Sequence, residues 1–69
     1  MDYIIEQHIE VLSVNEKTKW QKEVNLVSWA GRKAKFDIRE WNEDHTKCSR
    51  GITLTDEEME RLKNIEISK

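Results

Sequence analysis

The segment of residues 35–58, KFDIREWNEDHTKCSRGITLTDEE, constrains the fold of this chain more than any other. It opens with the alternation of a β-strand, because every second side chain of an extended chain lies on the same face. Phe36 and Ile38 point to one side of this strand, which we expect over residues 34–41. The opposite side carries Lys35, Asp37, Arg39 and Trp41. The strand therefore has one face for a core and one face toward solvent.

The rest of this segment leads from the strand into a helix. Residues 42–50 are polar and predict a loop, and residues 51–54, GITL, predict a short fourth strand. Thr55 followed by Glu58 has the pattern of a capping box, with acids in the first turn where the helix dipole is positive. We therefore expect a helix over residues 56–64.

Two further strands precede this segment. Residues 3–13 predict a half-buried strand, with Tyr3, Ile5, Ile9 and Val11 on one face and Glu6, His8 and Glu10 on the other. Residues 20–29 predict a second strand, with Val24 and Leu26 on one face and Glu23, Asn25, Val27 and Trp29 on the other. Residues 30–33 predict a tight hairpin in which Gly31 supplies a positive φ.

The expected order is β-β-β-β-α, an α+β fold in which one helix backs a four-stranded antiparallel meander. Residues 1–69 are too few for more than one domain, and the core of such a domain is small. Cys48 is the only cysteine, so no intrachain disulfide can add stability. One helix also leaves part of the sheet uncovered. We therefore expect oligomerisation, most simply a homodimer.

The sequence predicts a soluble, cytoplasmic protein. No apolar run approaches the roughly 20 residues that a membrane-spanning helix needs. The N-terminal residues, MDYIIEQHIE, lack the pattern of a signal peptide. A single cysteine suits a reducing compartment.

The net charge of −2 conceals a basic middle segment. Residues 17–50 carry nine Lys or Arg against five acids, and all three Trp lie within them. The local field governs binding of a polyanion more than the net charge does, so the acidic total does not exclude nucleic acid. The alternative is that these charges only keep the strand faces solvated.

The pattern of Trp and Arg points to single-stranded nucleic acid. Trp29 and Trp41 lie opposite the apolar residues of their strands, and Arg39 is two residues from Trp41. An indole stacks on a base, and a guanidinium binds phosphate. The alternative for an indole is core packing, which parity favours for Trp20. Arg39 also has an alternative, an ion pair with Asp37.

The sequence predicts neither a metal ion nor another cofactor. His45 and Cys48 are three residues apart, but no second pair of Cys or His completes a tetrahedral set with them or with His8. The chain has no Ser/His/Asp order, no glycine-rich phosphate loop and no HExxH motif. We therefore expect a protein that is not an enzyme and takes no small-molecule substrate.

KFDIREW, the polar loop, RGITLT and the acid-capped helix together resemble the DNA-binding domain of the transcriptional positive cofactor four family. The upstream VNLVSWAG is similar to the small bacterial YdbC-like members, and the resemblance covers residues 5–64. It implies a homodimer that binds single-stranded DNA with little sequence preference. It also implies that the curved sheets form a groove and that the helices pack at the dimer interface. No Ser-rich acidic tail precedes the domain, so coactivation of a eukaryotic polymerase is not implied.

The resemblance also implies roles for single residues. Trp29 takes the place of a stacking aromatic, and Trp41 that of an aromatic after the DIRE core. Arg39 is the arginine of that core, and Arg50 is the basic residue before the Gly-Ile strand. The expected nucleic-acid-binding residues are Lys22, Trp29, Lys33, Lys35, Arg39, Trp41 and Arg50.

The leading hypothesis is a homodimeric module that binds single-stranded DNA in transcription or DNA maintenance, with single-stranded RNA as the alternative ligand. A second hypothesis, of a different class, is a structural or protein-interaction dimer. Its basis is that Trp and Arg are also enriched at the hot spots of protein–protein interfaces.

Overall fold

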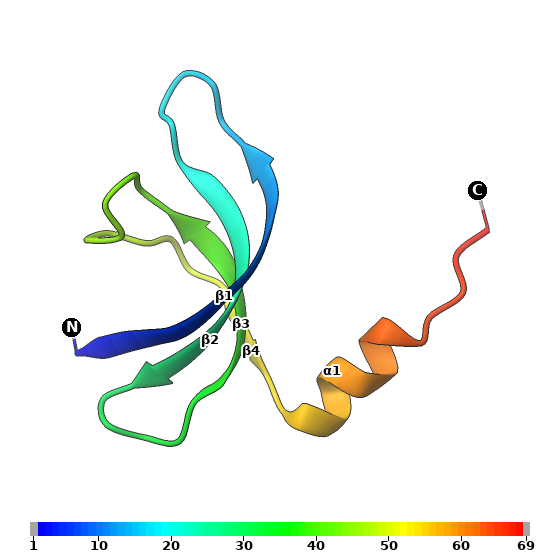
Figure 1. Cartoon of the computed structure of the whole chain (residues 1–69). Helices are drawn as coiled ribbons and strands as arrows, with labels where there is room; N and C mark the ends of the chain where they lie inside the picture. The colour runs from blue at the N-terminus through cyan, green and yellow to red at the C-terminus, as the bar shows by residue number, and fades with distance from the viewer. Residues whose placement is uncertain (1, 69) are drawn as a thin grey trace.

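The computed structural model describes residues 2–68. The strands are β1 (Tyr3–Val14), β2 (Gln21–Trp29), β3 (Lys35–Trp41) and β4 (Ile52–Leu54), and the helix is α1 (Asp56–Lys63). The strands form one antiparallel sheet in the order β1-β2-β3-β4 (Figure 1). The predicted α+β meander with a C-terminal helix is confirmed, and every predicted boundary lies within one residue of the observed one.

The sheet is strongly curved, and α1 lies on its convex side (Figure 1). β4 leads the chain out of the sheet and into the helix. The loop between β3 and β4, residues 42–51, extends on the concave side (Figure 1). The two faces of the sheet therefore have different surroundings, a loop on the inside and a helix on the outside.

The central strands β2 and β3 have the faces that their alternation predicts, because they pair without a bulge. The concave face carries the cross-strand pairs Gln21 with Trp41, Glu23 with Arg39, Asn25 with Asp37, and Val27 with Lys35. The convex face carries Val24 with Ile38 and Leu26 with Phe36. Val24, Leu26, Phe36 and Ile38 therefore face the helix side, as predicted.

The edge strand β1 departs from simple alternation. Its pairing with β2 shifts register at three places, the first of them between Ile5 and Gln7. An extra residue at a bulge moves the side chains that follow it to the opposite face. His8 therefore pairs with Asn25 and lies on the concave face together with Tyr3. The prediction that His8 lies on the face opposite Tyr3 is wrong for this reason.

The most buried side chains lie on the concave face, and most of them are polar. Val27 and Asp37 are fully buried (0% exposed), and Glu23 and Asn25 are 3% and 1% exposed. The Asn25 amide donates to Glu23 Oε1 at 3.0 Å, which satisfies both polar groups in part. The core of this domain is thus a polar layer inside the curve of the sheet.

Trp41 belongs to this core, and the prediction that it is exposed is wrong. Its exposed fraction is 0%. The β3–β4 loop folds back over the end of β3, where Cys48 forms a bridge with Trp41. Tyr3 and His45 lie against the indole, with ring centroids 5.1 and 5.6 Å from its own. A domain this small buries the indole on the side that alternation assigns to solvent.

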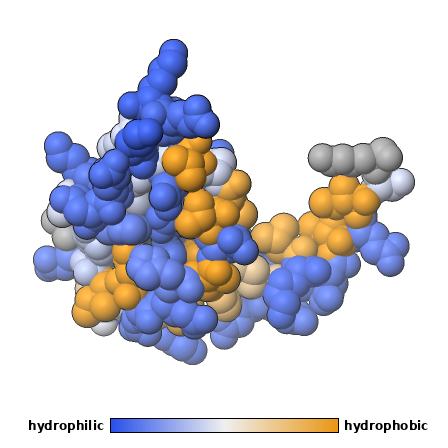
Figure 2. All heavy atoms as spheres, turned by 45° about the horizontal axis from the view of Figure 1, so that its top comes forward, coloured by the Kyte–Doolittle hydropathy of each residue, from blue (hydrophilic) through white to orange (hydrophobic). Residues whose placement is uncertain are grey.

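The helix α1 begins with the predicted capping box. Thr55 Oγ1 accepts from the Glu58 N–H at 3.1 Å, and Glu58 Oε1 accepts from the Thr55 N–H at 2.8 Å. No residue of α1 is buried, although Met59 and Leu62 line an open groove with the convex face. Apolar atoms accordingly continue from the sheet onto the helix at the surface (Figure 2). Within residues 2–68 no helix is long and apolar enough to cross a membrane.

Candidate functional site

An ion pair of Asp37 and Arg39 forms the polar centre of the concave face. Arg39 Nε donates to Asp37 Oδ1 at 2.6 Å, and Arg39 Nη2 donates to Oδ2 at 2.7 Å. The indole N–H of Trp29 donates to the same Oδ2 at 3.1 Å. The fully buried carboxylate therefore holds the guanidinium and the indole in one arrangement.

Burial and the neighbouring Asp37 shift the pKa of Arg39 in opposite directions. Burial by itself lowers the pKa of Arg39, but the hydrogen bonds and negative charge of Asp37 outweigh it, so the pKa of Arg39 is raised above its usual value. The predicted alternative, an Arg39–Asp37 ion pair, is confirmed. Since Asp37 balances its charge, Arg39 attracts a phosphate less strongly than an unpaired arginine would.

Trp29 is the centre of a cluster of stacked groups. Arg39 Cζ lies over the Trp29 ring, 4.4 Å from its centroid, which is a cation–π contact. The Trp29 and Trp41 rings are nearly parallel, at 13°, with centroids 6.1 Å apart. Tyr3 contacts Trp29 at a centroid distance of 5.6 Å. Trp29 is partly exposed whereas Trp41 is buried, so Trp29 is the indole of this cluster that a ligand can reach.

An open hollow of about 320 Å³ lies beside Trp29. Its lining residues are Trp29, Arg32, Lys33, Lys35, Arg39 and Thr53. Arg32, Lys33 and Lys35 are exposed and make no ion pair within residues 2–68. Unpaired cations around a partly enclosed surface attract a polyanion. The structure therefore brings Trp29, Lys33, Lys35 and Arg39 together, four of the seven nucleic-acid-binding residues predicted from the sequence.

The other three selected residues lie elsewhere. Trp41 is buried under the β3–β4 loop. Lys22 is on the convex face, because it is separated from the apolar residues Val24 and Leu26 of β2 by even numbers of residues and so shares their face. Arg50 is exposed, and its neighbour Gly51 lies so close to β3 that an added Cβ would be 2.4 Å from Arg39 Cβ. Gly51 therefore packs directly against Arg39, and Arg50 precedes it in the chain.

Two residues that line the hollow, Arg32 and Thr53, were not predicted from the sequence. Arg32 follows Gly31 in the hairpin before β3. It is adjacent in the sequence to Lys33, which was predicted, so the same basic turn also indicates Arg32 as a candidate. Thr53 has no such signal. It reaches the concave face because β4 pairs with β3 and sets Thr53 opposite Asp37.

The loop after β3 has a defined shape that aims His45 at the concave face. Asp44 Oδ1 accepts from the Thr46 hydroxyl at 2.7 Å and from the Thr46 N–H at 3.3 Å, and these bonds lower the pKa of Asp44. His45 itself has a φ of 59°, which few residues other than glycine adopt. The Tyr3 hydroxyl donates to the His45 carbonyl and so ties the loop to β1.

Two matches to known proteins bear on this site. A family model described as Transcriptional Coactivator p15 (PC4) matches residues 16–65, which contain the Asp37–Arg39 pair, the hollow and α1. An uncharacterized protein of Treponema pallidum (strain Nichols) is 41% identical over 46 residues, which are 67% of this chain and 54% of that protein. The chain thus spans about half the length of this curated relative.

Proposed function

Because this chain belongs to the transcriptional coactivator p15 (PC4) family, we propose that it binds single-stranded DNA with little sequence preference on the concave face of its sheet. The family match confirms the resemblance seen in KFDIREW and RGITLT. The observation that carries the proposal is the hollow beside Trp29, where a partly exposed indole adjoins three cations that form no ion pair within residues 2–68. A ring for bases and cations for phosphates are the two requirements of sequence-independent single-strand binding.

In the proposed complex, planar side chains contact the bases and basic side chains contact the phosphates. A base lies on the exposed surface formed by the Trp29 indole and the Arg39 guanidinium, since both planar groups stack on bases. Lys33 and Lys35 neutralise phosphates, together with Arg32 from the hairpin. Asp37 touches no ligand and acts by holding Trp29 and Arg39 in position.

The first expected result concerns salt. Arg32, Lys33 and Lys35 would neutralise three phosphates, so log K for oligo-dT should fall with log[salt] with a slope of about −2. Affinity should then drop roughly 20-fold between about 50 and 200 mM KCl. Fluorescence titration with labelled oligo-dT over this range measures the slope.

The matched control for the salt experiment is a lysine outside the hollow. Lys35→Ala should reduce the slope by about 0.7, whereas Lys22→Ala on the convex face should leave it unchanged. Duplex DNA and poly-U are titrated in parallel. Equal affinity for duplex would contradict single-strand binding, and preference for poly-U would make RNA the ligand. No response to any of the three would favour a protein-interaction dimer instead.

We further propose that the protein is a homodimer joined through its convex face. A groove of about 750 Å³ runs between the sheet and α1, and its apolar lining is Ile9, Val24, Phe36, Ile38, Met59 and Leu62. Leu62 is 45% exposed and Ile52, on the same side, is 56% exposed. A contiguous apolar surface of this kind is unusual on a monomer. A helix of eight residues with no buried side chain also needs packing from outside its own chain.

Leu62→Lys should therefore convert the dimer to a monomer and lower the melting temperature. The substitution sets a charge in the apolar groove, where a second copy would have to desolvate it. Light scattering after gel filtration measures the mass, and Glu57→Lys, on a helix residue outside the groove, is the control that should stay dimeric. A Leu62→Lys protein of unchanged dimeric mass would refute this interface.

A further inference from the structure

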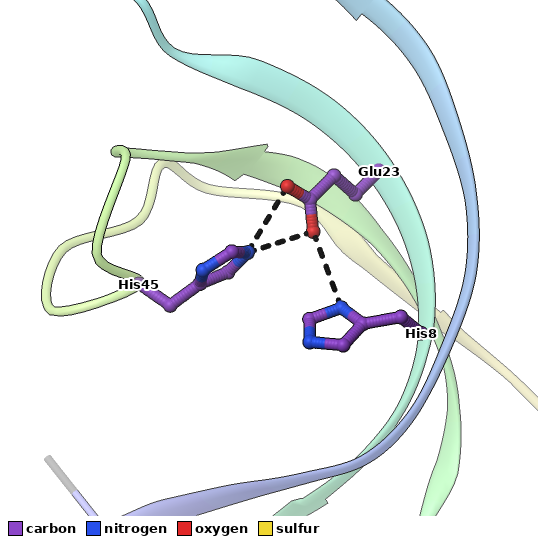
Figure 3. Close-up of side chains that lie close together, drawn as sticks. All are labelled: His8, Glu23 and His45. Atoms are coloured by element: carbon purple, nitrogen blue, oxygen red, sulfur yellow. Dashed lines mark hydrogen bonds and ion pairs between the residues drawn. The ribbon is translucent and has the colours of Figure 1, made fainter.

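Three potential metal ligands converge on the concave face from segments that are far apart in the sequence (Figure 3). His8 comes from the bulged strand β1, Glu23 from β2, and His45 from the loop after β3. His45 Nε2 is 3.0 Å from both Glu23 oxygens, and His8 Nδ1 is 3.8 Å from Glu23 Oε1. One ligand atom of each residue lies within 4.8 Å of the other two.

Glu23 is a buried carboxylate whose only ion-pair partners among residues 2–68 are these two imidazoles. It is 3% exposed, and burial of a carboxylate is unfavourable unless a positive group and hydrogen bonds compensate it. The buried Asn25 amide donates to Glu23 Oε1 at 3.0 Å. Such an outer hydrogen bond fixes the orientation of a ligating carboxylate. Within residues 2–68, no Lys or Arg forms an ion pair with Glu23.

His45 is aimed at Glu23 by a strained backbone. Its φ of 59° is in the left-handed region, which is unfavourable for a residue with a Cβ and persists only where other contacts enforce it. Those contacts are the Tyr3 hydroxyl on its carbonyl, and the Trp41 and His8 rings, whose centroids are 5.6 and 5.1 Å from that of His45. The His45 imidazole therefore lies next to the Glu23 carboxylate although this requires an unfavourable backbone conformation.

We propose that His8 Nδ1, the Glu23 carboxylate and His45 Nε2 bind a divalent ion of the zinc type. Zn–N and Zn–O bonds of about 2.0–2.1 Å imply ligand atoms about 3.3 Å apart in a tetrahedral site. The two distances to Glu23, 3.0 and 3.8 Å, bracket that value, and the two imidazole nitrogens lie within 4.8 Å of each other. His8 Nδ1 now lies 3.1 Å from Asn25 Oδ1, and the exposed His8 side chain would exchange this contact for the ion by a small rotation. On each ring the proton now facing the site moves to the other nitrogen.

The ligand set also selects the class of ion. Two imidazoles and one carboxylate suit Zn²⁺ and its transition-metal neighbours, whereas Ca²⁺ and Mg²⁺ require oxygen ligands. Three protein ligands leave a fourth tetrahedral position for water. His8, Glu23 and His45 line an open hollow of about 330 Å³, which leaves room for such a water. The inference rests on this geometry and is independent of the proposed binding of DNA.

Calorimetric titration of the untagged, chelator-treated full chain with Zn²⁺ tests the site. We expect one Zn²⁺ per chain, no heat of binding from Mg²⁺ or Ca²⁺, and a rise in melting temperature with Zn²⁺, because the ion binds only the folded chain. His8→Ala should abolish the binding while the fold is kept, since the His8 side chain is 64% exposed. His45→Ala should also abolish it.

Cys48→Ser is the matched control, because Cys48 is the only thiol that could bind zinc adventitiously. This variant should keep full affinity, and the Co²⁺-loaded chain should show tetrahedral ligand-field bands without a sulfur-to-metal charge-transfer band. Absence of Zn²⁺ binding would overturn the proposal. Binding that survives in His8→Ala, or that is lost in Cys48→Ser, would equally overturn it.

Discussion

Asp37→Ala should destabilise the domain by about 3–5 kcal/mol, because it removes one partner of a buried ion pair and leaves the other uncompensated. Asp37 is 0% exposed and accepts from Arg39 Nε, Arg39 Nη2 and Trp29 Nε1. A chain of 69 residues has a total stability of only about 3–10 kcal/mol, so this loss is a large fraction of the total. Urea denaturation at one fixed protein concentration measures the loss.

Glu43→Ala is the control for this substitution. Glu43 is an exposed acid just beyond β3, so its removal changes the net charge equally and should alter stability by no more than about 0.5 kcal/mol. The double variant Asp37→Ala with Arg39→Ala should lose less than the sum of the two single losses, because no unpaired charge remains. A single Asp37→Ala variant as stable as Glu43→Ala would show that the pair does not support the fold.

Trp29→Ala should weaken binding of oligo-dT by roughly 5- to 150-fold, the factor that corresponds to about 1–3 kcal/mol for one stacked base. Trp29 is the accessible indole of the concave cluster and carries the Arg39 guanidinium over its ring. Its removal takes away the stacking surface and leaves Lys33 and Lys35 in place. The salt slope should therefore remain nearly unchanged while the affinity falls. Fluorescence anisotropy of labelled oligo-dT measures both quantities.

Trp20→Ala is the matched control for the stacking experiment. Trp20 lies immediately before β2, and no aromatic contact within residues 2–68 includes its ring. Its removal should leave oligo-dT affinity within about twofold of the parent chain if stacking is confined to Trp29. Circular dichroism establishes that each variant is folded before binding is compared. Equal losses for the two variants would contradict a specific role of Trp29.

Much of the fold follows from local patterns. β2 and β3 alternate regularly and pair without a bulge, so parity assigns the faces of Val24, Phe36 and Ile38 correctly. The capping box of Thr55 and Glu58 depends on residues within one helical turn, and it forms as the spacing predicts. The DIRE strand and the Gly-Ile strand also identify the family, which the match over residues 16–65 confirms.

The candidate site is only partly predictable because its members meet through contacts between distant segments. Trp29, Lys33, Lys35 and Arg39 follow from strand parity and the hairpin. Lys22 is selected for its charge, although its parity already assigns it to the convex face. Thr53 enters the site through the register of β4 on β3, which no local pattern specifies.

The sequence by itself thus determined the order of the elements, the two faces of the central strands and the family, because strand alternation and helix capping act over a few residues. Only the tertiary structure decided that Trp41 is buried, that Asp37 neutralises Arg39, and that His8 meets Glu23. A bulge in β1 reverses the face of His8, and a folded-back loop covers Trp41. Both effects depend on which segments pack together, and packing is set by the whole chain.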